Sequence, residues 1–73
     1  MLLNQFGKRL AFLRKQKGFT QQELAESSEY SVEFISLVER GLNGPTLKGI
    51  EKLAIALSVH PKDLFDFKNR ENS

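Results

Sequence analysis

Residues 20–40 read TQQELAESSEYSVEFISLVER, and this stretch decides the fold. Thr20 and Glu23 have the spacing of a capping box, in which the hydroxyl accepts a hydrogen bond from the backbone N–H three residues on and the carboxylate accepts one from the N–H of the cap. A helix is therefore expected to begin after Thr20, to carry Leu24 inward and to end near residues 27–28.

A second helix is expected directly after the first. Ser31 can cap it, Ile35 and Val38 give it a buried stripe, and Gly41 stops it. The two helices are then separated by a break of about four residues. When Ile35 is set as the inward direction, steps of about 100° per residue identify an outward face. Its side chains are Glu33, Ser36, Leu37 and Arg40, with Val32 at the shoulder near the start of the helix.

The flanking segments are also expected to be helical. Apolar residues recur at steps of three and four over residues 3–17, which predicts one helix there. Residues 42–45 contain a glycine and a proline and are predicted to be a loop, after which Thr46 can cap a helix over residues 47–57. Pro61 is predicted to open a short fifth helix. The apolar stripes of the first two of these helices are Leu3, Phe6, Leu10 and Leu13, then Leu47, Ile50, Leu53, Ala54 and Leu57, and the short fifth helix holds Leu64 and Phe65.

Composition indicates one folded domain. The chain has 73 residues, of which 40% are hydrophobic and 27% charged, and this is too apolar for a disordered chain. Because period-two alternation is absent, the predicted fold is an all-α bundle of five short helices over residues 1–67, followed by a polar tail over residues 68–73. The start of the chain lacks the pattern of a signal peptide, and no apolar run is long enough for a membrane span, so a cytoplasmic protein is expected.

Catalytic and metal chemistry are not expected. The sequence has no cysteine, no glycine-rich phosphate loop and one histidine, His60, with no second ligand near it in the sequence. His60 is therefore interpreted as a turn or cap residue. No cofactor, catalytic site or metal site is predicted.

Charge is distributed unevenly along the chain. The formal net charge is +2, yet residues 1–19 carry five basic side chains and no acid, whereas residues 20–39 carry five acids and no base. The predicted pair of helices is therefore acidic, although the chain as a whole carries a small positive charge.

The motifs of this chain form a recognisable set. They are Thr20-Gln21-Gln22-Glu23-Leu24-Ala25, Ile35-Ser36, Glu39-Arg40-Gly41, Pro45-Thr46-Leu47 and residues 53–59, with Phe6-Gly7, Leu10 and Leu13-Arg14 in register upstream. The set resembles the phage-repressor and Cro type of helix-turn-helix domain, the Xre-like class of bacterial regulators. The resemblance covers about residues 6–65.

That resemblance implies a lambda-repressor-like fold with the helix-turn-helix at its second and third helices. It implies a transcriptional regulator, in most cases a repressor, that binds a palindromic operator in double-stranded DNA as a homodimer. The recognition helix would be residues 31–40. The implied base-contact positions are Ser31, Val32, Glu33, Ser36 and Leu37, to which the outward face adds Arg40.

The chemistry of these base-contact candidates is unusual. Glu33 could accept a hydrogen bond from the N4 amine of cytosine, while Val32 and Leu37 could pack on thymine methyl groups. Ser36 suits either kind of base, and Arg40 could reach guanine or phosphate. The alternative is that Glu33 is solvated and that the apolar side chains meet another protein.

Phosphate contacts are expected outside the recognition helix, because such contacts position that helix on the DNA and supply much of the affinity for DNA. Helix starts, the loop and flanking lysines provide the candidates. The resemblance implies a phosphate contact for Gln21, and the others are Lys15, Lys17, Asn43, Thr46 and Lys48. Surface or capping roles alone are the alternative for each.

Two further features follow from the resemblance. It places an acid at Glu39 that pairs with Arg14, and a buried bridge is predicted, with a loose surface pair as the alternative. Glu29 replaces the glycine that is usual in the turn of this family. Because a left-handed backbone costs a residue with a side chain about 1 kcal/mol, the turn is expected to be longer or differently shaped.

The biological role stays open between several classes. The C-terminal apolar residues Leu64, Phe65 and Phe67 are predicted to form the homodimer contact. A Cro-like repressor, a controller of a restriction-modification operon and a self-repressing antitoxin are all compatible with the chain. The alternative function is a protein-interaction module on the same fold, which would bind a toxin or another regulator. Its surface would be Val32, Phe34 and Leu37, flanked by Glu29 and Glu33.

Overall fold

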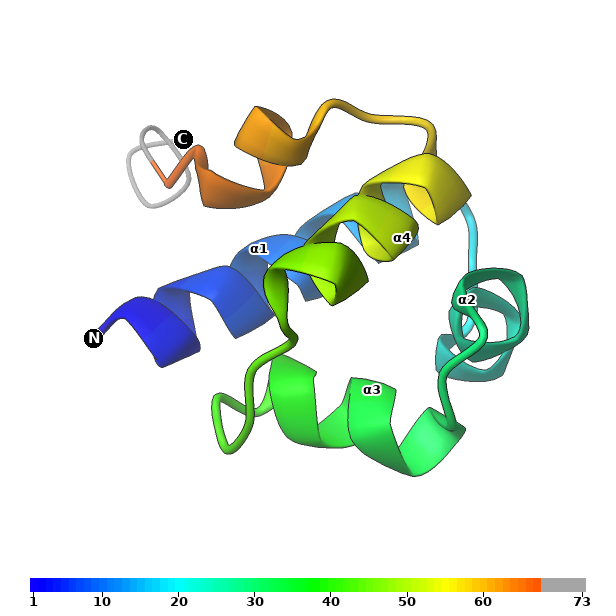
Figure 1. Ribbon diagram of the computed structural model, residues 1–73, viewed down its shortest axis with the longest axis horizontal. Coiled ribbons are helices and arrows are strands. Elements are labelled where there is room, and N and C mark those ends of the chain that lie inside the picture. Colours follow the sequence, from blue (N-terminus) through cyan, green and yellow to red (C-terminus); the bar gives the residue numbers. More distant parts are fainter. Residues whose placement is uncertain (68–73) are drawn as a thin grey trace.

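The computed structural model describes residues 1–67, and its regular elements there are all helical (Figure 1). The elements are α1 (Leu2–Gln16), α2 (Gln21–Ser28), α3 (Val32–Glu39), α4 (Leu47–Leu57) and the 3-10 helix η1 (Pro61–Phe65). The expected all-α fold is confirmed over these residues. The predicted polar tail, residues 68–73, lies outside the described residues.

Side-chain caps begin three of the helices where the sequence predicts them. The capping box of α2 is complete: the N–H of Glu23 donates to Thr20 Oγ1 at 3.0 Å, and the N–H of Thr20 donates to Glu23 Oε1 at 2.9 Å. The hydroxyls of Ser31 and Thr46 each accept a backbone N–H at 3.1 Å, and so they cap α3 and α4. These caps satisfy donors that have no partner inside the helix.

The predicted fifth α-helix is wrong, because η1 is a 3-10 helix of five residues. Four N–H groups at the start of an α-helix have no partner inside it, so a segment this short gains almost nothing from α-helical bonding. The tighter pattern is used instead, with the N–H of Asp63 donating to the carbonyl of His60 at 2.9 Å. Arg9 Nε donates to the Asp63 carbonyl at 2.8 Å and so ties η1 to α1.

The core draws on every element. Its members are Phe6, Leu10, Leu13, Leu24, Ala25, Ile35, Val38, Leu53, Ala54, Leu57 and Leu64. The predicted inward positions of Leu3 and Leu47 are wrong, since these side chains are 47% and 86% exposed. Both lie in the first turn of a helix, where fewer neighbouring elements can cover them.

The arrangement leaves one side of α3 open. This helix packs on α1 and α2, whereas η1 packs on α1 and α4. Figure 1 shows α3 along one edge of the molecule and η1 along the opposite edge. Over residues 1–67, none of the helices has the length and apolar character needed to cross a membrane.

A glycine sets the closeness of α1 and α3. A Cβ atom at Gly7 would overlap the carbonyl oxygen of Val38 and lie 2.8 Å from that of Glu39. Only a residue without a side chain lets the two backbones approach this closely.

Candidate nucleic-acid interface

The turn between α2 and α3 is short and regular. Glu29 adopts the left-handed conformation with φ 67°, and its N–H donates to the carbonyl of Ala25. The N–H of Tyr30 donates to the same carbonyl at 2.9 Å, so these bonds close α2. The expectation of a longer or differently shaped turn is therefore wrong: glutamate adopts the conformation that glycine usually supplies, and its carboxylate accepts from Lys52 Nζ at 3.2 Å.

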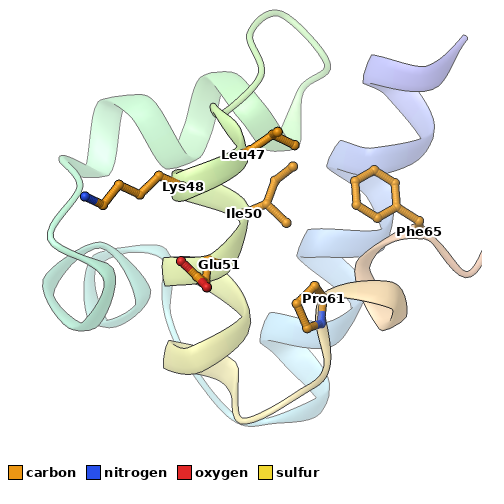
Figure 2. A pocket seen from close by; sticks show the side chains of 6 residues that line it. All are labelled: Leu47, Lys48, Ile50, Glu51, Pro61 and Phe65. Carbon is orange, nitrogen blue, oxygen red and sulfur yellow. The ribbon is translucent and has the colours of Figure 1, made fainter.

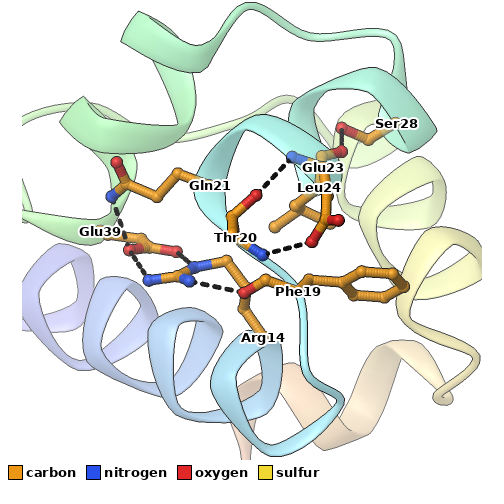
Figure 3. A network of polar contacts seen from close by, with 8 residues as sticks. All are labelled: Arg14, Phe19, Thr20, Gln21, Glu23, Leu24, Ser28 and Glu39. Atoms are coloured by element: carbon orange, nitrogen blue, oxygen red, sulfur yellow. Dashed lines mark hydrogen bonds and ion pairs between the residues drawn. The ribbon is translucent and has the colours of Figure 1, made fainter.

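A buried polar network, here called the anchor network, joins three helices at one point (Figure 3). Arg14 of α1 pairs with Glu39 of α3 through Nε–Oε2 at 2.6 Å and Nη2–Oε1 at 3.1 Å. Its Nη1 donates to the carbonyl of Phe19 at 2.8 Å, and Gln21 Nε2 of α2 donates to Glu39 Oε1 at 2.9 Å. The Arg14 and Glu39 side chains are only 10% and 7% exposed, so this is a buried bridge and not a loose surface pair.

The Gln21 contact with Glu39 has no signal in the sequence, because the two residues are 18 positions apart and belong to different helices. It holds the side chain of Gln21 beside α3. An amide nitrogen carries two hydrogens, so one of them remains for an external acceptor. The predicted phosphate contact of Gln21 stays a prediction, now for a side chain whose position is fixed.

The outward face of α3 and the start of α2 enclose a shallow hollow of about 400 Å³, here called the α3 hollow. It is lined by Gln21, Val32, Glu33, Ser36, Leu37 and Arg40. The structure therefore brings the predicted base-contact residues together with Gln21, except for Ser31. The hydroxyl of Ser31 is used to cap α3 and does not line the hollow.

The α3 hollow is chemically mixed. Val32, Ser36 and Leu37 are half-buried, whereas Glu33 and Arg40 are exposed. Within residues 1–67, no hydrogen bond or ion pair is found for the Glu33 carboxylate. The surface thus offers two apolar side chains, a hydroxyl and an uncompensated carboxylate, with the guanidinium at the end of the helix.

The remaining phosphate candidates lie outside the α3 hollow. Lys15, Lys17 and Lys48 are exposed, as expected for residues that could meet a solvated partner. Asn43 Oδ1 accepts from the N–H of Gly44 at 2.8 Å, and Thr46 is used as the cap of α4. The loop that carries these two residues follows directly on the end of α3 (Figure 1).

The acidic excess of residues 20–39 is partly compensated, since two of its five acids pair with a cation. Glu23 completes a capping box, Glu39 pairs with Arg14, and Glu29 pairs with Lys52. Glu26 lies on α2 outside the α3 hollow. Glu33 is then the one acid of this segment that lines the hollow without a cation beside it in the described chain.

A second depression, the α4–η1 groove, is apolar (Figure 2). It is lined by Leu47, Lys48, Ile50, Glu51, Pro61 and Phe65. In Figure 2 the ring of Phe65 and the side chain of Ile50 face each other across it. The sequence missed Leu47 as a surface residue, because the stripe of α4 assigns it to the core, whereas Ile50 packs against the core as expected and also lines the groove.

The predicted dimer residues are only partly at the surface. Leu64 is 0% exposed and lies in the core, so its assignment to an interface is wrong. Phe65 is 41% exposed, and its ring centre lies 5.2 Å from that of Phe6 and 6.2 Å from that of Phe67. Phe65 and the half-buried Phe67 therefore stay candidates.

The apolar patch of the alternative function is smaller than expected. Phe34 packs against the core and stacks on Tyr30 with ring centres 4.5 Å apart. Only Val32 and Leu37 of that patch line the α3 hollow.

Comparison with known proteins gives a consistent picture. Residues 10–64 match the family model described as Helix-turn-helix. The chain is 40% identical over 63 residues to the control protein C.BamHI of Bacillus amyloliquefaciens, covering 85% of this chain and 78% of that protein. It is 34% identical over 64 residues to the transcriptional regulator SinR of Bacillus subtilis, covering 86% of this chain and 58% of SinR.

A solved structure agrees in sequence and in fold. The crystal structure of the restriction-modification controller protein C.AhdI from Aeromonas hydrophila superposes with a TM-score of 0.84 at 43% identity. The match covers 86% of this chain and 91% of the controller. The path of the backbone described above is therefore shared by a protein of nearly the same extent.

Proposed function

The chain belongs to the helix-turn-helix family, and on this basis we propose that it is a transcriptional regulator that binds double-stranded DNA with sequence specificity through α3. One observation carries the proposal: the outward face of α3 forms the α3 hollow, while the anchor network fixes the helix against α1 and α2. The major groove of DNA is wide enough to admit a helix held in this way. The protein would act in the cytoplasm, with residues 1–67 as the DNA-binding domain.

Phosphate contacts would surround the reading helix. Gln21 lies at the first position of α2, and Asn43 and Thr46 lie between α3 and α4. Side chains and free backbone N–H groups at such places can donate to phosphate oxygens on either side of a groove. The exposed Lys15, Lys17 and Lys48 would add the counterion-release part of the affinity.

Selection of bound DNA from a random double-stranded pool tests this function. A palindromic site is expected, with half-sites about 34 Å apart, because a two-fold dimer places its recognition helices one turn of DNA apart. The logarithm of the affinity is expected to fall linearly with the logarithm of the salt concentration. A pool without any enriched sequence would refute the proposal.

The substitution Arg40→Ala is expected to weaken binding to the selected site by about tenfold or more, because it removes an exposed cation from the edge of the α3 hollow. The slope of affinity against salt should also become shallower. Lys62→Ala is the matched control: it removes one exposed cation from η1, on the edge of the molecule opposite α3 (Figure 1). An equal loss in both variants, measured by titration at two salt concentrations, would argue against the assignment of α3.

We further propose that the protein binds DNA as a homodimer through the α4–η1 groove. A single helix-turn-helix covers about one half-site, so a second copy is needed for a palindrome. Leu47 is 86% exposed and Phe65 is 41% exposed, and they lie with Ile50 in one groove. Phe67 packs against Phe65 and extends the same surface.

Leu47→Glu is expected to turn the dimer into a monomer, since it places a charge in an apolar contact, and sedimentation equilibrium at tens of micromolar measures this. The control is Ile55→Glu. Ile55 is also an exposed apolar residue of α4, at 74%, but it faces the side of α2 and does not line the groove. A wild-type protein that sediments as a monomer, or a control that dissociates as readily, would contradict the proposed interface.

Repression is the proposed mode of regulation, because binding over a promoter excludes other proteins without any further domain. Of the roles compatible with the sequence, control of a restriction-modification operon is favoured by the 43% identity to the controller C.AhdI over most of both chains. Expression of a reporter from the upstream region, with and without the protein, distinguishes repression from activation.

A further inference from the structure

We propose that the α3 hollow reads the major-groove edge of a cytosine and that it binds 5-methylcytosine more tightly than cytosine. The inference rests on the proposed function, because it takes the α3 hollow as the surface that faces the bases. It also specifies the ligand of that surface: a base that carries a hydrogen-bond donor next to a methyl group.

The Glu33 carboxylate requires a hydrogen-bond donor on the base that it faces. It is exposed, lines the hollow, and has no cation beside it within residues 1–67. A carboxylate brought into a groove between phosphates is repelled unless it accepts a hydrogen bond there. The donors on the major-groove edge are the N4 amine of cytosine and the N6 amine of adenine.

The neighbours of Glu33 distinguish these two donors. Leu37 lies one helical turn after Glu33 and is therefore its neighbour on the helix surface. Leu37 and Val32 are both half-buried and line the same hollow. Beside its amine, adenine presents the N7 acceptor, which would face the carboxylate or an apolar wall unfavourably. Cytosine presents the C5 carbon in that place, so cytosine satisfies both the carboxylate and the apolar side chains.

Methylation of cytosine then has opposite effects at its two positions. A methyl group on C5 occupies the place of the thymine methyl and would be buried against Leu37 and Val32. A methyl group on N4 replaces the hydrogen that is not used in base pairing, so Glu33 loses its donor. The first change should strengthen binding and the second should weaken it.

The test uses the full chain and the DNA site selected from the random pool. Each cytosine of a half-site is replaced in turn, on both strands of the palindrome, by 5-methylcytosine and by N4-methylcytosine. At one position, C5 methylation is expected to tighten binding about fourfold per half-site, the factor for burying one methylene-sized group. N4 methylation at the same position is expected to weaken it at least about tenfold, as for the loss of a hydrogen bond to a charged group.

Two variants separate the contributions. Leu37→Ala should reduce the gain from C5 methylation, since only Val32 then remains as an apolar wall, and should keep the loss from N4 methylation. Glu33→Gln should reduce the loss from N4 methylation, because a neutral amide oxygen is a weaker acceptor than a carboxylate, and should shift the selected base from cytosine towards adenine, because an amide pairs with adenine in two places. Glu26→Gln, an exposed glutamate of α2 outside the hollow, is the matched control and should leave both responses unchanged.

The outcomes separate this inference from the function on which it rests. A protein that enriches no DNA sequence overturns the proposed function. A protein that binds a defined site with equal affinity for all three forms of cytosine, or more weakly after C5 methylation at every position, overturns the cytosine assignment and leaves DNA binding intact. An unchanged base preference in Glu33→Gln also overturns the assignment.

Discussion

Replacing Arg14 by alanine is expected to lower the free energy of unfolding by about 3–5 kcal/mol, because it leaves the Glu39 carboxylate buried without its cation. The glutamate side chain is only 7% exposed and would keep the Gln21 amide as its one remaining donor among the described residues. The carbonyl of Phe19 also loses a donor. A domain of this length has a total stability of about 4–11 kcal/mol, so thermal unfolding should show a large fall in midpoint.

The other ion pair found within residues 1–67 is a direct control for Arg14–Glu39. Lys52 and Glu29 are joined at 3.2 Å, but their side chains are 43% and 77% exposed, so Lys52→Ala is expected to cost less than about 1 kcal/mol. Combining Arg14→Ala with Glu39→Ala should cost less than the sum of the two single changes, since the uncompensated charge is gone. If the two single losses in the free energy of unfolding add up in the double variant, or if Arg14→Ala and Lys52→Ala cost the same, burial does not explain how much the anchor network stabilises the fold.

Gly7→Ala is expected to destabilise the fold by about 3 kcal/mol or more, at the upper end of the range for overpacking. Its Cβ would overlap the Val38 carbonyl oxygen and crowd that of Glu39, and both atoms belong to the backbone of α3. Helix propensity alone would make alanine the better residue by about 1 kcal/mol, so the sign of the measured change identifies the clash. Denaturant unfolding with an unchanged slope gives the loss directly.

Gly49→Ala provides the comparison for Gly7→Ala. A Cβ at Gly49 would also overlap a neighbour, but the crowding atoms belong to side chains, the Tyr30 hydroxyl and Pro45 Cβ, and not to the backbone of another helix. A smaller loss than at Gly7 is therefore expected, partly offset by the better helix propensity of alanine. If Gly7→Ala and Gly49→Ala lower the free energy of unfolding equally, the clash with the backbone of α3 does not explain the loss at Gly7.

Local chemistry explains what could be predicted from the sequence. The caps at Thr20, Ser31 and Thr46 depend on residues three positions apart, so their spacing is readable in the chain and the helices start where expected. The outward face of α3 follows from helical periodicity. That periodicity correctly brings Val32, Glu33, Ser36, Leu37 and Arg40 to one surface.

Tertiary packing explains what could not be predicted. Leu64 and Leu47 have similar apolar side chains, yet one is fully buried and the other 86% exposed, because only the packing of neighbouring elements decides which position is covered. The contact of Gln21 with Glu39 joins residues far apart in the sequence and leaves no periodic signal. Glu29 shows the same limit, since a residue type that disfavours the left-handed conformation still adopts it when the surrounding helices require it.

The residues that hold α3 in place differ from those on its outward face. Arg14 and Glu39 hold the helix from its buried side, and neither of them lines the α3 hollow. Outward residues can therefore be substituted while the contact between Arg14 and Glu39 stays intact. Under the proposed DNA-binding function, a library confined to Glu33, Ser36 and Leu37 would change which bases are selected, whereas Val32 would be kept because it packs against the core.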